Sequence, residues 1–285
     1  MTGRRPSSLG ILILIALPTL IAFPAGAQVI APAGRTLFNR AVMVRSFLRL
    51  ENFDEPAPGQ ELRRWINPYA VIWGTTPRLS LSFVSPLVRV ESRGLQGTSR
   101  SSDTTGTGDS TVFARYDWLH HDVPRGSTRL SPEIGLRLPT GGAFGDGSTD
   151  VITTLVFSHV RDPHWIVSDV QFTWNRRGDG DRRAGNQWRF DAAYLFRLLP
   201  RKGLAQHGLF TVVELNGEHR RKSRRQGRAE RNTGGDLLFL SPGIEWFASR
   251  RLVLELSVPI PVHRDLNGSQ PEPATAVVAG LRWLF

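Results

Sequence analysis

The last twelve residues, 274–285, constrain the fold of this chain more than any other segment. Thr275, Val277 and Ala279 begin a row of mostly apolar side chains, which alternates with a row of smaller or more polar ones. This alternation has a period of two and predicts a β-strand. The strand has the length that a tilted membrane-crossing strand needs, about 9–11 residues.

The end of this strand carries a second signal. Its apolar row finishes with Leu281, Trp283 and the C-terminal Phe285. A terminal aromatic of this kind resembles the closing strand of bacterial outer-membrane β-barrels, where it belongs to the assembly signal. The alternative is a strand of a soluble β-sandwich that ends in phenylalanine.

The start of the chain indicates export. Arg4 and Arg5 precede an apolar stretch at 9–23, and the Ala-Gly-Ala sequence at 25–27 fits a cleavage site. We therefore expect a secretory signal peptide at 1–27, a short periplasmic segment at 28–39 and a barrel at 40–285. No later stretch contains the roughly 20 apolar residues of a membrane helix. A membrane location would then require a barrel.

Composition limits the chemistry that the chain can carry. It has no cysteine, which excludes disulfides, thiol nucleophiles and thiolate metal sites. Its seven histidines show no metal-binding spacing. We therefore expect neither a metal nor a cofactor.

Segments with a period of two divide the chain after residue 39 into twelve candidate strands. They are 40–50, 62–74, 77–90, 110–121, 129–139, 150–160, 164–175, 187–198, 208–218, 236–248, 252–261 and 274–285. Each clear case has one face suited to lipid and one suited to water. This predicts an all-β fold, a single antiparallel transmembrane β-barrel of about 12 strands, with 10 to 14 open.

The connections between these segments alternate in length. Those at 92–109, 176–186 and 219–235 are long and polar, whereas those at 75–76, 161–163 and 249–251 are short. Outer-membrane barrels have short turns on the periplasmic side and longer loops outside. We therefore expect both termini in the periplasm and the whole barrel in the bacterial outer membrane.

The water-facing rows of the strands carry a nearly balanced set of charges, with seven arginines and eight acids. A paired network is one reading, because unpaired charges in a narrow lumen are costly, and an anion-selective lining is the other. The set is Arg45, Arg49, Arg115, Asp117, Glu133, Arg137, Asp169, Arg189, Asp191, Arg197, Glu214, Glu218, Glu245, Glu255 and Arg282.

The excess positive charge of the chain, +11, falls mainly in two long loops. The more basic one carries Arg220, Arg221, Lys222, Arg224, Arg225, Arg228 and Arg231. On a cell surface these side chains would meet the phosphates of lipopolysaccharide, with which guanidinium groups pair well. A solvated, disordered charge run is the alternative. Nucleic-acid binding is not expected of an exported chain without a recognition motif.

A catalytic role has weak support. Ser158 and His159 resemble the serine and histidine of outer-membrane lipid hydrolases. Neighbours in a strand point to opposite faces, however, so these two cannot form a nucleophile–base pair. We expect no catalytic residue, and a lipid-modifying enzyme remains an alternative function.

Several segments together resemble one outer-membrane family. GTGDST at 106–111 leads into ARY at 114–116, and GLRLPTG follows at 135–141. LSPGIEW at 240–246 precedes LELSVPIP at 254–261. Over about 60–285 this layout is similar to the meta-pathway phenol degradation proteins, often labelled transporters. The resemblance implies a barrel that passes small aromatic or apolar compounds.

The leading expectation is a passive channel or transporter for such compounds. A structural or surface protein with a closed lumen, whose basic loops bind lipopolysaccharide, is the alternative. Expected partners are outer-membrane lipid and lipopolysaccharide, the barrel-assembly machinery and small aromatic solutes. Inward phenylalanines fill the lumen or contact a substrate; they are Phe47, Phe113, Phe210, Phe239 and Phe247.

Overall fold

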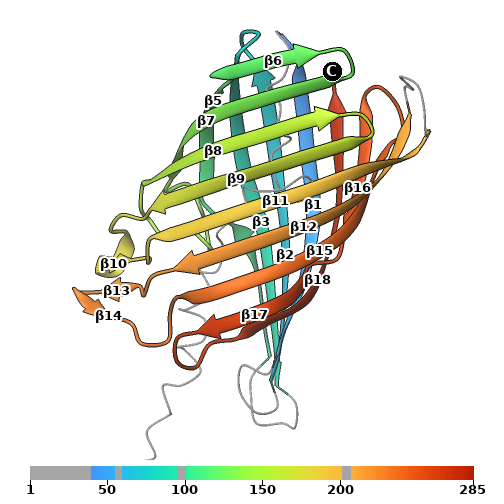
Figure 1. The fold of residues 1–285 in the computed structure, drawn as a ribbon. Helices are drawn as coiled ribbons and strands as arrows, with labels where there is room; N and C mark the ends of the chain where they lie inside the picture. The colour runs from blue at the N-terminus through green and yellow to red at the C-terminus, as the bar shows by residue number, and fades with distance from the viewer. Residues whose placement is uncertain (1–39, 55–59, 95–100, 201–206) are drawn as a thin grey trace, which may run out of the picture.

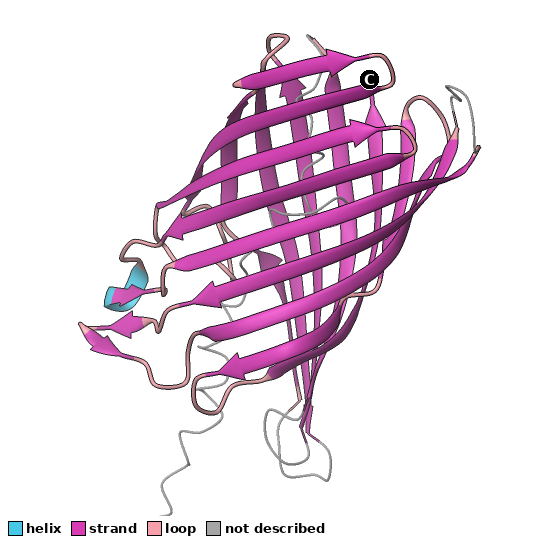
Figure 2. Cartoon of the chain, viewed as in Figure 1, coloured by secondary structure: helices cyan, strands magenta, loops and turns pink. Residues whose placement is uncertain are grey.

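The computed structural model describes residues 40–54, 60–94, 101–200 and 207–285. The expected signal peptide at 1–27 and the segment 28–39 lie outside this part. The described residues form a closed antiparallel sheet and a small second sheet, and their helical content is a single 3-10 turn at Asp179–Asp181 (Figures 1 and 2). None of their helices is long and apolar enough to cross a membrane.

Twelve antiparallel strands make the barrel wall. Two of them are interrupted: β4 to β6 form one strand broken at 108–109 and 117–118, and β16 and β17 form another broken at 258–259. The strands are β1 Val42–Asp54, β2 Gln60–Gly74, β3 Leu79–Gly94, β4 Ser102–Thr107, β5 Ser110–Tyr116, β6 Leu119–Val123, β7 Gly126–Leu138, β8 Asp150–Arg161, β9 His164–Trp174, β11 Gln187–Leu199, β12 Gly208–Arg220, β15 Gly235–Phe247, β16 Leu252–Ser257, β17 Ile260–Leu266 and β18 Glu272–Leu284.

The first and last strands close the barrel. β1 and β18 pair from Met43 opposite Leu284 to Asp54 opposite Glu272, and the backbone N–H of Phe285 donates to the carbonyl of Val42 at 2.8 Å. All other neighbours in the wall are also neighbours in the chain. The predicted all-β barrel of about 12 strands is confirmed, and all twelve predicted segments lie on wall strands.

Alternation along each strand separates lumen from lipid. On β18, Val277 and Leu281 are each 42% exposed on the outside, whereas Ala276 and Val278 are buried on the inside. Large apolar side chains cannot be left in water over so wide a surface without cost, so this face fits a hydrocarbon environment. The inner face carries the polar row of the predicted pattern.

The two ends of the barrel differ in their connections. Short turns at 124–125, 162–163 and 248–251 define one end, called here the turn end, where β1 begins and β18 finishes. Longer segments at 139–149, 175–186 and 221–234 define the loop end. The lengths alternate as expected; the placement of the termini in the periplasm stays a prediction.

Aromatic side chains mark the turn end on the outside. Trp73, Tyr116, Trp246 and Trp283 lie near short turns and are between 38% and 50% exposed, as an interfacial girdle requires. Trp165 also lies near the turn end of its strand. It instead points into the lumen, because its position on β9 belongs to the inward row.

One expected loop is partly strand. The segment 92–109 was expected to be a long connection, but β3 continues to Gly94 and β4 pairs with it, with Glu91 opposite Asp103. β4 is polar on both faces, so it has none of the apolar alternation that signals a half-buried strand. The hairpin extends the wall beyond its apolar part.

The basic loops also contain regular structure. β10 (Arg182–Arg183), β13 (Arg224–Arg225) and β14 (Arg228–Ala229) form a three-stranded sheet beside the loop end (Figure 1). This sheet, with the loop residues 221–231 that contain β13 and β14, is called here the loop sheet. Arg182 Nε pairs with Glu230 Oε2 at 3.0 Å and so joins the two loops. The basic residues 220–231 therefore lie in a folded segment and not in a disordered charge run.

Candidate functional site

The candidate site is the barrel lumen, which receives all fifteen charged residues predicted to face it. Fourteen lie in the inward row of a strand, and Asp117 lies in the break between β5 and β6. Twelve are buried, and Arg137, Arg197 and Glu218 are partly buried. Their polar groups need partners, because a buried unpaired charge costs several kcal/mol.

Four of these residues form an ionic quartet in the turn half of the lumen. Arg282 on β18 contacts Glu245 Oε1 at 2.8 Å and also bonds Glu255 through its Nε. Arg45 on β1 reaches the second oxygen of Glu255 at 3.2 Å. The quartet therefore links β15, β16, β18 and β1 across the seam where the barrel closes.

A second ionic group lies on β1 and β2. Glu51 accepts hydrogen bonds from Arg49 Nε at 2.5 Å and Arg64 Nε at 2.7 Å. Glu51 was not predicted, because the first candidate strand stopped at residue 50. Extending that strand by one residue would have identified Glu51 in its inward row. Arg64 was not predicted either, although it lies within the candidate segment 62–74.

On the facing part of the wall, Arg189 and Asp191 follow each other in the inward row of β11. Asp191 accepts a hydrogen bond from Asn216 Nδ2 at 2.7 Å, and Asn216 in turn accepts one from Ser241 at 2.7 Å. The Arg189 guanidinium is 3.8 Å from Asp191, too far for a hydrogen bond.

Further ion pairs run along the wall between strands that are close neighbours. Arg115 pairs with Glu133 at 2.8 Å, and Arg197 pairs with Asp162 at 2.9 Å. Asp117 is held by Arg129 at 2.8 Å and by Ser131 at 2.6 Å. Arg129 was missed, since it lies at the first residue of the predicted segment 129–139. These pairs favour the paired network over a lining of free charges.

Apolar side chains fill the turn half of the lumen beside the quartet. Trp165, Phe210 and Phe247 contact one another with ring centroids 4.7 to 5.9 Å apart. They pack on a buried cluster made by Phe47, Val167, Ala193, Leu195, Val212 and Val278. We call these nine residues the apolar plug. Among the expected inward phenylalanines, Phe47, Phe210 and Phe247 belong to it.

The segment 139–149 folds back toward the wall at the loop end. Its Phe144 is 6% exposed and packs against a cluster from β1 to β3 that includes Ile66 and Val88. Asp109 holds this segment by accepting hydrogen bonds from the backbone N–H groups of Gly141 at 2.8 Å and Asp146 at 3.0 Å. Burial raises the pKa of Asp109, and these two donors offset the rise only in part.

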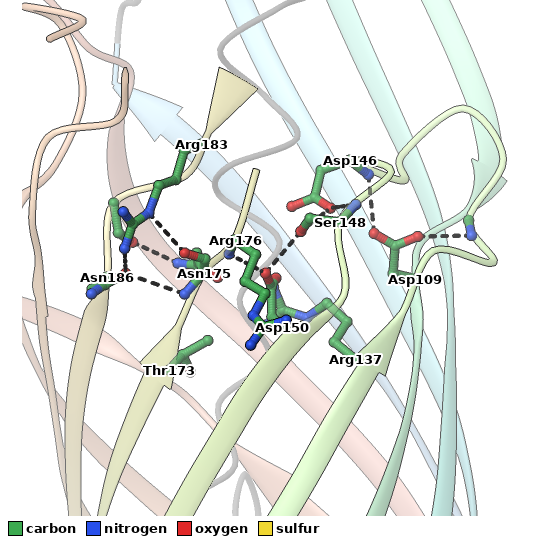
Figure 3. A network of polar contacts seen from close by, with 12 residues as sticks. Asp109, Arg137, Asp146, Ser148, Asp150, Thr173, Asn175, Arg176, Arg183 and Asn186 are labelled. Carbon is green, nitrogen blue, oxygen red and sulfur yellow. Dashed lines mark hydrogen bonds and ion pairs between the residues drawn. The ribbon is translucent and has the colours of Figure 1, made fainter. Parts of the chain in front are cut away.

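Figure 3 shows how this anchor continues along the loop end. Ser148 donates to both Asp146 and Asp150, at 2.7 and 2.8 Å. Asp150 also accepts the backbone N–H of Arg176 at 2.7 Å and pairs with Arg137 at 3.2 Å. The segments 139–149 and 175–186 are thereby fixed to each other and to the wall.

Between the plug and the loop end lies a cavity with a volume of about 70 Å³. We call it the lumen pocket. Arginines and acids from β1, β2, β11 and β12 meet apolar side chains there. Its lining is Arg49, Glu51, Arg64, Ile66, Arg189, Asp191, Asn216, Gly217, Glu218, Arg220, Leu237, Phe239, Pro259 and Pro273.

The seven residues predicted for the basic loop differ in location and exposure. Arg220 does not lie on the loop surface: it is 8% exposed and pairs with Glu218 at 2.7 Å at the rim of the lumen pocket. The basic run continues into β12, whose inward row includes residue 220. The other six lie in the loop itself, and all except the half-exposed Arg225 are exposed: Arg221, Lys222, Arg224, Arg228 and Arg231.

The remaining candidates lie apart from the lumen pocket. Leu281, Trp283 and Phe285 face outward and are 42%, 38% and 69% exposed. Ser158 is buried and inward, whereas His159 on the opposite face exchanges a 2.8 Å hydrogen bond with Thr128. The two therefore cannot act as a nucleophile and its base. The described residues contain no cluster of metal-ligating side chains.

Known structures share this fold. An outer membrane channel from Pseudomonas putida F1 has 16% identity and a TM-score of 0.69, over 90% of this chain and 100% of that one. The β domain of the Bordetella autotransporter BrkA has 10% identity and a TM-score of 0.50, over 87% and 100%. No curated protein sequence matches the chain. The architecture is that of a bacterial outer-membrane β-barrel, and the expected location in the outer membrane is confirmed.

The sequence also matches a protein family. Residues 47–263 match the family described as "Putative MetA-pathway of phenol degradation", which covers most of the chain. The protein belongs to this family, and the resemblance inferred from its motifs is confirmed.

Proposed function

We propose that the protein is a passive outer-membrane channel for small aromatic or apolar compounds. The observation that carries this proposal is the lumen pocket, which combines apolar side chains with fixed polar groups inside a closed barrel. Its volume of about 70 Å³ limits an occupant to a small molecule. The family name and the shared fold with a channel support the same conclusion.

The apolar plug determines what could pass beyond the pocket. Leu195 and Val278 are fully buried, and the ring contacts of Trp165, Phe210 and Phe247 fill the space beside them. Ions would lose hydration there without gaining polar partners, whereas an apolar solute would lose nothing. We therefore expect low ion conductance and a clear preference for uncharged aromatic solutes.

Two measurements on the protein test this function. Initial uptake of labelled phenol by cells with intact lipopolysaccharide should be faster when the protein is present, and planar bilayers should show small single-channel currents. Truncating Phe210 and Phe247 together to alanine should increase both. Phe190→Ala, on the lipid face, is the matched control. Absence of both uptake and current would refute a channel.

The second candidate is a surface protein with a closed lumen. The apolar plug and the exposed bases of the loop sheet favour it. In this case phenol uptake and current would be absent, while purified lipopolysaccharide would bind the loops.

An enzyme is the third candidate. It would require lipid hydrolysis that is lost in His159→Ala, and the opposite faces of Ser158 and His159 argue against it.

A further inference from the structure

We propose that the lumen pocket is a binding site for a small organic anion, a carboxylate attached to an apolar ring or chain. The inference rests on the proposed function, because it names a substrate class for that lumen. It follows from the charges, the free donors and the apolar wall of the lumen pocket.

Positive charge exceeds negative charge around this cavity. Four guanidinium groups, from Arg49, Arg64, Arg189 and Arg220, line it together with three carboxylates, from Glu51, Asp191 and Glu218. The pairs Arg49–Glu51 and Arg220–Glu218 account for two of the cations, and Arg64 shares Glu51 with Arg49. Among the lining residues alone, one entering carboxylate would balance the charge; Asp169, opposite Asp191 on β9, lies behind this lining.

Arg189 is the group best placed to receive that carboxylate. Its side chain is 4% exposed, and its Nη1 donates no hydrogen bond to any residue that the structure describes. The nearest acid, Asp191, is 3.8 Å away and already accepts from Asn216. A buried guanidinium donor without an acceptor is costly, and a carboxylate is the acceptor whose planar geometry matches it.

The rest of the lining suits the apolar body of such a ligand. Leu237, Phe239, Pro259 and Pro273 come from β15, the β16–β17 break and β18, and they form one side of the cavity. The guanidinium of Arg49 lies 5.9 Å from the ring centroid of Phe239, so charge and apolar surface are adjacent. A bare inorganic anion would use the arginines and leave this wall uncovered.

Isothermal titration calorimetry of the folded, full-length protein in detergent tests the site with three probes. Benzoate carries both the charge and the ring, benzyl alcohol carries only the ring, and acetate carries only the charge. We expect benzoate to bind about tenfold more tightly than either of the others, since a charge-assisted hydrogen bond supports a difference of this size. The benzoate affinity should fall as ionic strength rises.

Arg189→Gln removes the guanidinium and leaves a shorter, uncharged polar side chain. It should weaken benzoate binding about tenfold and leave benzyl alcohol binding unchanged. Arg115→Gln is the matched control, because Arg115 is equally buried in the lumen but pairs with Glu133 outside the pocket. Heat-modifiable migration on gels verifies that each variant is folded, and if Arg189→Gln does not fold, the probe comparison on the unaltered protein decides.

Equal affinities for benzoate and benzyl alcohol, or no loss of benzoate binding in Arg189→Gln, would overturn the proposal. The outcomes also separate it from the proposed function. Phenol uptake without any preference for benzoate rejects the anion site alone. Benzoate binding with neither uptake nor current retains the site and rejects the channel.

Discussion

Arg282 illustrates how single residues stabilise this lumen. Its guanidinium contacts two carboxylates, Glu245 and Glu255, each without measurable side-chain exposure. Without Arg282, both carboxylates would remain buried and would lose this cationic partner. Breaking such a pair costs more than the pair contributes by forming, because the desolvation cost of the remaining charge is not recovered.

The first prediction concerns this residue. Arg282→Met should destabilise the barrel by about 3–5 kcal/mol, since it leaves two buried carboxylates with one arginine. The shift of the urea midpoint of heat-modifiable migration measures the loss. Arg250→Met, in the exposed turn 248–251, is the control and should have little effect.

Adding Glu245→Gln and Glu255→Gln to Arg282→Met should recover part of the stability, because the buried negative charge is then gone. A triple variant that is no more stable than Arg282→Met would show that packing, not charge, explains the loss.

At the scale of elements, the segment 139–149 is a loop that narrows the lumen rather than a surface loop. It depends on Asp109, which accepts two of its backbone N–H groups, and it buries Phe144 against the inner wall. The sequence shows a glycine-rich turn there and gives no signal of the inward fold, because the contacts involve residues from β1 to β3 that lie far away in the chain.

The second prediction follows from this anchor. Asp109→Ala removes both acceptors, so the segment should leave the lumen and single-channel conductance should rise. Asp103→Ala, an exposed acid on the neighbouring β4, is the control for charge alone. Equal conductance of Asp109→Ala and the unaltered protein would mean that Phe144 packing is enough to hold the segment.

The loop sheet supports a third prediction. Replacing Arg221, Arg224 and Arg228 by glutamine should weaken retention of the purified protein on immobilised lipopolysaccharide, and high salt should have the same effect. The control replaces three exposed arginines at the turn end, Arg78, Arg250 and Arg251, by glutamine. Unchanged retention of the triple variant would exclude the loop sheet as the contact.

For the whole molecule, the twelve-strand architecture was predictable because every wall strand has one face toward lipid, which forces a period of two. The polar extension β4 has no such face and was missed. The inward charges followed from the same period, whereas Arg220 was assigned to the loop because the basic run does not stop where β12 ends. The lumen pocket could not be predicted, since it depends on which strands face each other across the lumen.

The fourth prediction concerns delivery of the whole chain to the membrane. Phe285 is 69% exposed and contributes little packing, so Phe285→Ala should leave refolding in detergent unchanged. In cells it should lower the amount of heat-modifiable protein in the outer membrane several-fold, if the terminal aromatic is read by the assembly machinery. Val262→Ala, on the outer wall, serves as control. Equal amounts in cells would remove the assembly role.

The ionic quartet has a consequence for the order of assembly. Arg45 comes from the first strand and Glu255 lies 210 residues later in the chain, so their bond can form only when the two ends of the sheet have met. Until then Arg45 stays at one open edge, while Glu245, Glu255 and Arg282 lie together on β15, β16 and β18 near the other edge. When β1 pairs with β18, the Arg45–Glu255 bond becomes buried. Reopening the seam would then have to break a buried ion pair, which opposes separation of the two strands.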